Sequence, residues 1–236
     1  MRKPYRYGDK KASRIVGILY ITGTVAGILS VPFLNIRNAP DDLIAIANNP
    51  NSLVIGAVLE LIMGFTLAMI PAFMFPILKR YNEVLGVGYI IFRGALETCT
   101  YIIQAACYLA LSSLGLAYAT AGIQNLDQFL VIGTMLNAII ELPLGMFAFG
   151  MGALLFYSAL YLYRLIPRWI SGFGIIAVLL HMAAGMFVLF GLQENFDKGS
   201  LLMNLPIAVQ EMVMAVWLII KGFRIAEIDP ASKAFL

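Results

Sequence analysis

The sequence predicts an all-α integral membrane protein, a bundle of six transmembrane helices, and two observations carry this prediction. Of the 236 residues, 61% are hydrophobic and 12% are charged, whereas an ordinary soluble domain has about 45–50% apolar and about 25% charged residues. Six apolar runs are each long enough to cross a bilayer, which takes about 20 residues. Helices are expected because the runs lack the alternation of barrel strands and must satisfy their backbone groups internally.

The six runs leave room only for short connections. They are Ile15–Leu34, Leu53–Leu78, Leu85–Leu114, Pro143–Tyr163, Trp169–Leu192 and Leu201–Ile220. The first run is too long for the core of a signal peptide and lacks a small-residue cleavage pattern, so we expect it to be retained. The sequence therefore predicts a single integral membrane domain over residues 1–236.

Lysine and arginine in the connections indicate the orientation of the chain in the membrane. The loops after the first and fifth runs hold only Arg37 and Lys198. Thirteen basic residues occupy the two tails and the turns after the second and fourth runs: Arg2, Lys3, Arg6, Lys10, Lys11, Arg14, Lys79, Arg80, Arg164, Arg168, Lys221, Arg224 and Lys233. Both termini are thus predicted to be cytoplasmic, in agreement with an even number of spans.

Two connections are predicted to contain helices of their own. After Asn38, a proline and the acids Asp41 and Asp42 precede an apolar stretch, a pattern typical of a helix N-terminus. We expect a short amphipathic helix there, in the first external loop. The stretch Leu126–Leu142 is apolar but meets Pro143, which disrupts helices. It is either an interfacial helix that leads into the fourth span or an outward extension of that span.

Ionisable residues inside the spans are the best candidates for function, because a charge in the bilayer costs several kcal/mol unless it is paired or hydrated. Four are expected near the middle of the membrane, namely Arg93, Glu97, His181 and Glu211. Glu60 and Glu141 are expected nearer the outer face.

The third span carries a polar stripe. Its members recur at intervals of four, four, three and four residues and are Arg93, Glu97, Tyr101, Gln104 and Tyr108. This spacing places them on one helical face, which cannot point toward lipid, and it allows Arg93 and Glu97 to pair directly. On the sixth span, Asn204 and Glu211 are seven residues apart and share a face.

Convergence of these faces would enclose more carboxylates than cations. Glu60, Glu97, Glu141 and Glu211 would face one arginine and one neutral histidine. A low-dielectric site cannot hold such an excess, so carboxylates would be protonated or a cation would be bound. This favours proton, metal-ion or cationic-ligand binding over anion binding.

Structural interpretations of the same residues stand beside the functional ones. The Arg93–Glu97 pair can be a buried lock that sets helix register. Glu60 and Glu141 can reach interfacial water, and His181 can be a hydrogen-bonded residue of the packed interior.

Three stretches of the chain carry a family resemblance: Arg14–Tyr20, Tyr89–Glu97 and Leu205–Phe223. They resemble the bacterial multi-pass membrane proteins of domain-of-unknown-function family 4386, nearly from end to end of the chain. The residues at the positions characteristic of that family are Phe92, Arg93, Glu97, Pro167, Arg168, Trp169, Gln210, Glu211, Trp217, Lys221 and Gly222. The resemblance implies a bacterial cell membrane and six helices, and it implies no biochemical activity. His181 and Glu141 match no pattern of the family.

The first functional hypothesis is an integral membrane protein that binds or transports a small molecule, cation or proton. Its midplane site would contain Arg93, Glu97 and Glu211, with Arg93 holding Glu97 ionised and Glu211 taking up a proton or small cationic ligand. The ligand would arrive through an outward-opening vestibule whose lining includes Glu60, Gln104 and Asn204, and His181 is a further candidate for the site. This hypothesis needs no metal or other cofactor, and the expected partner is the lipid bilayer, with no nucleic acid.

Two alternatives come from other functional classes. The chain could be an intramembrane metal-dependent hydrolase with carboxylates and His181 as ligands, although it has no His-Glu-x-x-His or Glu-x-x-His spacing. It could also be a non-catalytic accessory subunit that packs against a partner protein through its lipid-facing surface.

Overall fold

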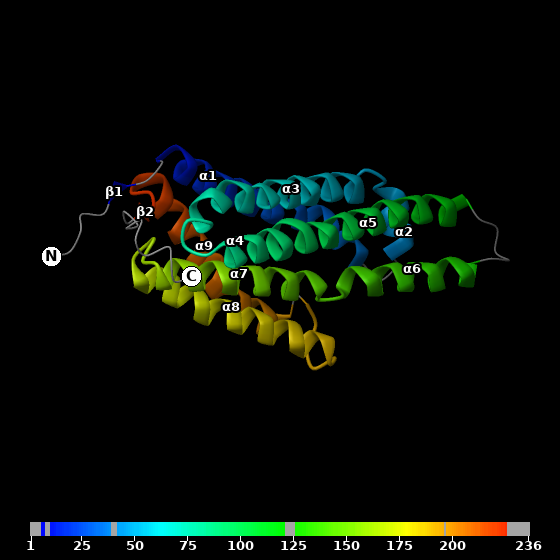
Figure 1. Ribbon diagram of the computed structural model, residues 1–236. Coiled ribbons are helices and arrows are strands. Elements are labelled where there is room, and N and C mark those ends of the chain that lie inside the picture. Colours follow the sequence, from blue (N-terminus) through cyan, green and yellow to red (C-terminus); the bar gives the residue numbers. More distant parts are fainter. Residues whose placement is uncertain (1–5, 8–9, 39–41, 121–125, 196, 226–236) are drawn as a thin grey trace.

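The computed structural model describes residues 6–7, 10–38, 42–120, 126–195 and 197–225, which form a long bundle of helices (Figure 1). The first half contains α1 (Lys10–Leu34), η1 (Asn35–Asn38), α2 (Asp42–Asn48), α3 (Ser52–Leu78), α4 (Glu83–Tyr89) and the π-helix η2 (Ile90–Leu96). The second half contains α5 (Glu97–Thr120), α6 (Leu126–Glu141), α7 (Leu144–Leu162), α8 (Arg168–Leu189) and α9 (Lys198–Ile220). Two short strands, β1 (Arg6–Tyr7) and β2 (Arg224–Ile225), complete the described elements.

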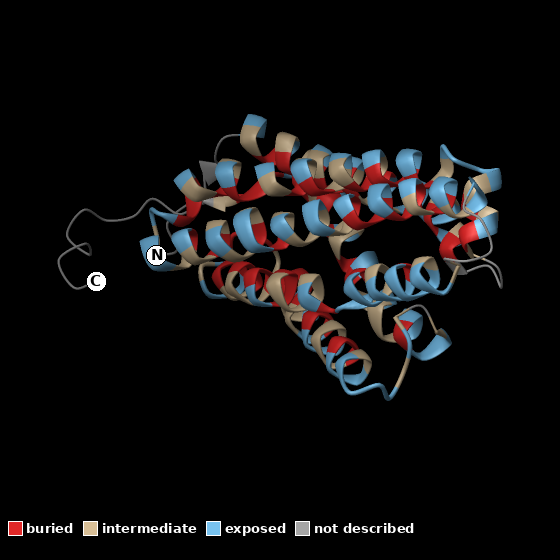
Figure 2. Cartoon of the chain, turned by 90° about the vertical axis from the view of Figure 1, so that its right-hand side faces the viewer, coloured by how far each residue is buried: buried red, intermediate tan, exposed pale blue. Residues whose placement is uncertain are grey.

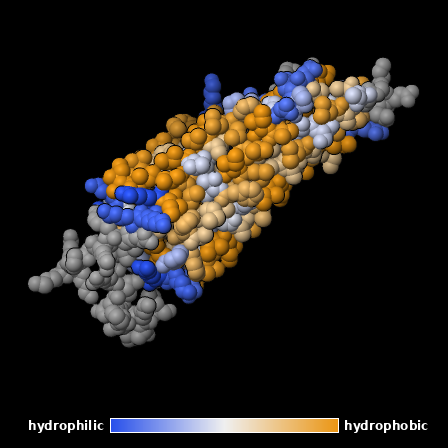
Figure 3. All heavy atoms as spheres, turned by 90° about the horizontal axis from the view of Figure 1, so that it is seen from above, coloured by the Kyte–Doolittle hydropathy of each residue, from blue (hydrophilic) through white to orange (hydrophobic). Residues whose placement is uncertain are grey.

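Six helical segments are long and apolar enough to cross a membrane, which confirms the predicted all-α, six-span fold. They are Lys10–Arg37, Ser52–Leu78, Glu83–Thr120, Leu126–Leu162, Arg168–Leu189 and Lys198–Ile220. Buried residues face the inside of the bundle and exposed ones face outward (Figure 2). The outward faces are nevertheless apolar, with Ile28 and Ile220 each 65% exposed. Hydrophilic residues gather toward the two ends of the molecule (Figure 3), as expected for a bundle surrounded by lipid.

Both ends of the described chain lie at one end of the bundle. β1 and β2 pair antiparallel, with Arg6 opposite Ile225. Nearby, the backbone N–H of Phe223 donates to Ser13 Oγ over 3.2 Å. The two ends of the described chain therefore lie on the same side, as an even number of spans requires, and the side of the membrane to which this end belongs stays a prediction. We call it the terminus end and the opposite one the distal end.

The helices around the core pack closely where glycine removes a side chain. α1 packs against α3 and α9, α3 against α5, and α7 against α8. A Cβ at Gly17 of α1 would lie 2.6 Å from the carbonyl oxygen of Ala215 in α9. Only glycine permits this approach of the two backbones, which small residues favour in membrane helices.

The distal end settles the open question about Leu126–Leu142. α6 continues the direction of α7 beside α5, with a break at Leu142 and Pro143 between them (Figure 1). The stretch is thus an extension of the fourth span at the distal end, and Pro143 interrupts the helix as expected. The 38 residues from Glu83 to Thr120 span about 57 Å at 1.5 Å per residue. That length exceeds the bilayer core of about 30 Å.

The predicted short helix after the first span is present as α2, which packs against α5. Its residues Leu43 and Ile46 are buried, while Ile44 is 47% exposed. Of the expected start signal, Pro40 and Asp41 lie outside the described residues. Asp42 opens the helix, and its Oδ1 accepts from the backbone N–H of Leu43 over 2.7 Å.

Candidate functional site

Arg93 lies in the π-helical turn η2, at the junction of α4 and α5. Its side chain is 2% exposed. α7 approaches this turn through Gly152, where a Cβ would lie 3.0 Å from the backbone nitrogen of Arg93. Single π turns inside α-helices occur frequently at functional sites. The local backbone thus directs a guanidinium group into the interior of the bundle.

Two glutamates share this guanidinium group. Arg93 Nη1 donates to both carboxylate oxygens of Glu97, over 2.8 and 2.9 Å. Arg93 Nη2 donates to Oε1 of Glu211, over 3.3 Å. The hydroxyl of Tyr101 donates to Glu97 Oε1 over 3.0 Å. The pair predicted within the third span is present, and Glu211 joins it from α9.

The two carboxylates differ in how firmly they are held. Glu97 accepts three hydrogen bonds and its side chain is 1% exposed. Glu211 accepts one longer bond among the described residues, and its side chain is 14% exposed. With both glutamates ionised, the cluster of Arg93, Glu97 and Glu211 contains one negative charge in excess of its single positive charge.

Aromatic rings surround the guanidinium group. Its central carbon lies 4.5 Å from the ring centre of Phe149 and 5.9 Å from that of Tyr20. Such contacts stabilise a cation, by about 2 kcal/mol or more when it is desolvated. The sequence did not identify these rings as site residues, because aromatic residues in an apolar run are ordinary packing residues.

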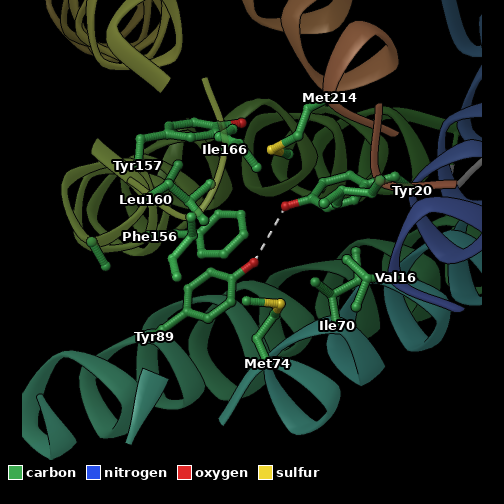
Figure 4. Close-up of a cluster of buried hydrophobic side chains, with 14 of the residues drawn as sticks. Val16, Tyr20, Ile70, Met74, Tyr89, Phe156, Tyr157, Leu160, Ile166 and Met214 are labelled. Carbon is green, nitrogen blue, oxygen red and sulfur yellow. Dashed lines mark hydrogen bonds between the residues drawn. The ribbon is translucent and has the colours of Figure 1, made fainter. Parts of the chain in front are cut away.

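A layer of aromatic and sulfur-containing side chains closes the bundle on the terminus side of the charged cluster. Figure 4 shows the hydroxyl groups of Tyr20 and Tyr89 pointing toward one another, 3.3 Å apart. Phe156 stacks on Tyr89, with ring centres 4.6 Å apart. Tyr89 precedes Arg93 by one turn and Met214 follows Glu211 by one turn, so both lie toward the terminus end. We call this layer, with Met74 and Tyr157, the aromatic barrier.

Glu60 lies on the distal side of the cluster. One turn from it on α3, Gly64 contacts the ring of Tyr101, since a Cβ there would lie 3.0 Å from that ring. Glu60 therefore sits on the face of α3 that packs on α5, outward of Tyr101. The residue is 7% exposed, and its Oε2 has no hydrogen-bond partner among the described residues. An ionised carboxylate in this position is costly.

Gln104 and Asn204, the other expected vestibule residues, have partners of their own. Gln104 Nε2 donates to the carbonyl oxygen of Ile140 over 3.0 Å, which ties α5 to α6. Asn204 Oδ1 lies 2.8 Å from Nδ1 of His181, and its Nδ2 donates to Ser200 Oγ over 3.3 Å. These bonds join α5 to α6 and α8 to α9.

His181 matches the hydrogen-bonded interpretation through its contact with Asn204. Because the amide oxygen only accepts, Nδ1 of His181 is the donor. The imidazole also meets the ring of Phe149 edge-on, with centres 4.9 Å apart. Phe149 thus lies between His181 and Arg93 and connects the histidine to the charged cluster through packing.

Glu141 does not belong to the midplane cluster. Its side chain is 54% exposed and bonds Arg37 over 3.1 Å. Both residues line a recess of about 650 Å³ near the distal end of α8, together with Glu194 and Asn195. Glu141 therefore takes no part in a convergence of four carboxylates, because α6 carries it beyond the level of Glu97 and Glu211, away from the midplane as the sequence predicts.

The described residues contain no group of three or more histidine, cysteine, aspartate or glutamate side chains that could hold a metal ion. Glu97 and Glu211 are two carboxylates around an arginine, and His181 is bonded to an amide. The metal-dependent hydrolase hypothesis therefore finds no ligand set in this part of the chain.

Comparison with known proteins identifies the family of the chain. No curated protein and no solved structure matches it. Residues 15–222 match the family model described as domain of unknown function (DUF4386). The match covers all six spans and includes Arg93, Glu97 and Glu211, in agreement with the resemblance found in the sequence. The chain belongs to this family of multi-pass membrane proteins of unknown function.

Proposed function

We propose that the protein binds a proton in the middle of the membrane, at Glu211, and that this protonation is coupled to the binding or transport of a small molecule. The observation that supports the proposal is the sharing of one arginine by two carboxylates of unequal bonding. Arg93 neutralises Glu97. An ionised Glu211 then leaves a net negative charge inside the bundle, which costs several kcal/mol in a membrane interior.

A proton fits this site better than a metal ion does. Hard cations such as Ca²⁺ take about six to eight oxygen ligands, whereas a proton needs one carboxylate oxygen. Glu97 already uses its oxygens for Arg93 and Tyr101. Protonation of Glu211 removes the excess charge and weakens one contact of 3.3 Å. Glu211 is therefore the carboxylate at which a proton is gained with the least loss of bonding.

The surroundings favour access from the distal side. The aromatic barrier lies on the terminus side of Glu211, since its member Met214 follows Glu211 by one turn toward that end of α9. On the distal side, Tyr101 links Glu97 to the face of α3 that carries Glu60. We assign Glu60 the role of a second proton-holding group on this route.

Infrared difference spectroscopy tests the assignment of Glu211. Spectra of the protein in liposomes of zwitterionic phospholipid are compared between alkaline and mildly acidic buffer. The acidic buffer is kept well above a pH of about 4, where exposed carboxylates titrate. We expect a carboxylic-acid band to form on acidification and to lose the part of its intensity that belongs to Glu211 in Glu211→Gln. The amide keeps the shape of the side chain and can still accept from Arg93, so the fold should be retained.

Glu194→Gln is the matched control, because Glu194 is an exposed glutamate of the distal recess. This variant should keep the band. Absence of the band in the unmodified protein, or an undiminished band in Glu211→Gln, would overturn the proposal. Loss of the band in Glu60→Gln alone would assign the proton to Glu60 and equally reject Glu211.

A further inference from the structure

The lipid-facing surface between α8 and α9 is hollowed near the terminus end. The groove has a volume of about 440 Å³, and its lining comprises Trp169, Ile170, Met212, Val213, Val216, Trp217, Ile220 and Lys221. Trp169 is 64% exposed and Ile220 65%. Lys221 and Met212 are nine residues apart, so the groove follows α9 for about 13 Å.

The position of the groove relates it to the membrane surface. Trp169 lies in the first turn of α8 and Trp217 in the last turn of α9, which places both rings near the terminus end. Tryptophans at helix ends mark the level of the lipid headgroups. From that level the groove runs inward along Val216 and Val213 to Met212, beside Glu211.

The chemistry of the groove is divided between its floor and its mouth. The floor is apolar, and no carboxylate belongs to the lining in the described ranges. The mouth is cationic, because Lys221 lines it. The guanidinium carbon of Arg224 lies 5.7 Å from the ring centre of Trp217. An apolar channel that ends in positive charge at the headgroup level complements an anionic lipid.

The groove is distinct from the charged cluster in the interior, because its lining contains none of Arg93, Glu97 and Glu211.

We propose that this groove is a binding site for an anionic phospholipid. One acyl chain lies along Val213, Val216 and Ile220, and the headgroup phosphate contacts the ammonium group of Lys221. The site is independent of the proton-binding function proposed above, since it involves neither Glu211 nor Arg93.

The two tryptophans provide a built-in probe. The sequence contains 2 tryptophans, and both line the groove. Phospholipids with brominated acyl chains quench tryptophan fluorescence on contact. We expect brominated phosphatidylglycerol, which is anionic, to quench the fluorescence of the purified full-length protein at about five-fold lower mole fraction than brominated phosphatidylcholine. This is the effect of one cationic side chain near an anionic lipid surface.

Variants locate the preference. Lys221→Gln should largely remove the preference for the anionic lipid, so that the two brominated lipids quench at about the same mole fraction. Lys221→Arg keeps the positive charge and should retain the preference. Lys79→Gln is the matched control, since Lys79 directly follows α3, is exposed and pairs with Glu83 over 3.3 Å. It removes the same charge from the terminus end and should leave the preference unchanged. Trp169→Phe leaves Trp217 as the sole reporter and should show the same preference.

Three results would overturn the proposal, and two of them need no variant. Equal quenching by the two lipids would remove the anionic preference, and absence of quenching by either would show that acyl chains do not enter the groove. An equal loss of preference in Lys221→Gln and Lys79→Gln would assign the effect to the general charge of this end instead of the groove.

Discussion

At the residue scale, Arg93 is the centre of the polar interior. It neutralises Glu97 by two short bonds, holds Glu211 by a longer one, and lies against Phe149. Breaking a buried ion pair costs more than the pair contributes, because the remaining partner is left charged and unsolvated. The three residues should therefore respond unequally to substitution.

We expect Arg93→Leu to be the most destabilising change in the cluster, by about 3–5 kcal/mol, because it strands two carboxylates. Glu97→Leu should cost less, since Arg93 keeps Glu211. The double variant should also cost less than Arg93→Leu alone. The free energy of unfolding in detergent, obtained by denaturant titration, measures all three.

Lys79 and Glu83 form the control pair. They have the same spacing as Arg93 and Glu97 and lie 3.3 Å apart, but their side chains are 55% and 61% exposed. Exposed pairs of this kind contribute at most about 0.5 kcal/mol. Strictly additive losses for Arg93→Leu and Glu97→Leu would contradict a direct interaction between them.

At the element scale, the π turn η2 and the glycine opposite it position the site together. The wider hydrogen bonding of the π turn shifts the side chains after it around the helix axis relative to those before it. Gly152 lets α7 lie directly against the backbone of Arg93. The same close contact brings Phe149, one turn earlier on α7, over the guanidinium group. Packing between α7 and η2 therefore supports the geometry of the charged cluster.

Gly152→Ala should destabilise the protein by about 1–3 kcal/mol, the usual cost of overpacking. The new Cβ would lie 3.0 Å from the nitrogen of Arg93 and 3.1 Å from its Cβ, and neither atom can move without the helix. Gly172→Ala is the control, because its Cβ would meet Tyr161 at an ordinary 3.5 Å. That change should be neutral or stabilising by up to about 1 kcal/mol, through helix propensity. Equal thermal stability of the two variants would refute the close-contact argument.

At the scale of the whole molecule, segments far apart in the sequence gather at the terminus end. β1 pairs with β2, and the backbone N–H of Arg224 donates to the carbonyl oxygen of Leu165, in the turn between α7 and α8. The turn between α3 and α4 lies at the same end (Figure 1). These segments carry most of the basic residues, and the positive-inside rule assigns such an end to the cytoplasm.

Reporter fusions test this orientation in cells. Reporters inserted after Lys79 or Arg164 should behave as cytoplasmic, whereas those inserted within Asn35–Ser52 or Gln193–Ser200 should behave as external. The physical reason is the cost of moving clustered lysine and arginine across the membrane. The reverse pattern at these four positions would mean that the bundle has the opposite orientation in the membrane, and that the proposed proton access opens to the opposite side.

The amino-acid sequence by itself determined the fold class, the six spans and the pair within the third span. Each of these depends on local properties: the length of an apolar run is compared with the bilayer thickness, and a spacing of four residues brings Arg93 beside Glu97 on one helix. The break at Pro143 was predictable for the same reason, since proline removes a backbone donor.

Only the tertiary structure decided which helices meet. Glu211 is 118 residues from Arg93 in the chain, and Glu141 pairs with Arg37, 104 residues away. Periodicity tells which face of a helix is polar, but it does not tell which neighbour that face contacts or at what level. The sequence therefore did not establish which of the four carboxylates would meet, and it did not distinguish the firmly bonded Glu97 from the more exposed Glu211. That difference arises because Arg93 and Tyr101 both donate to Glu97, whereas α9 brings Glu211 within reach of one nitrogen of Arg93.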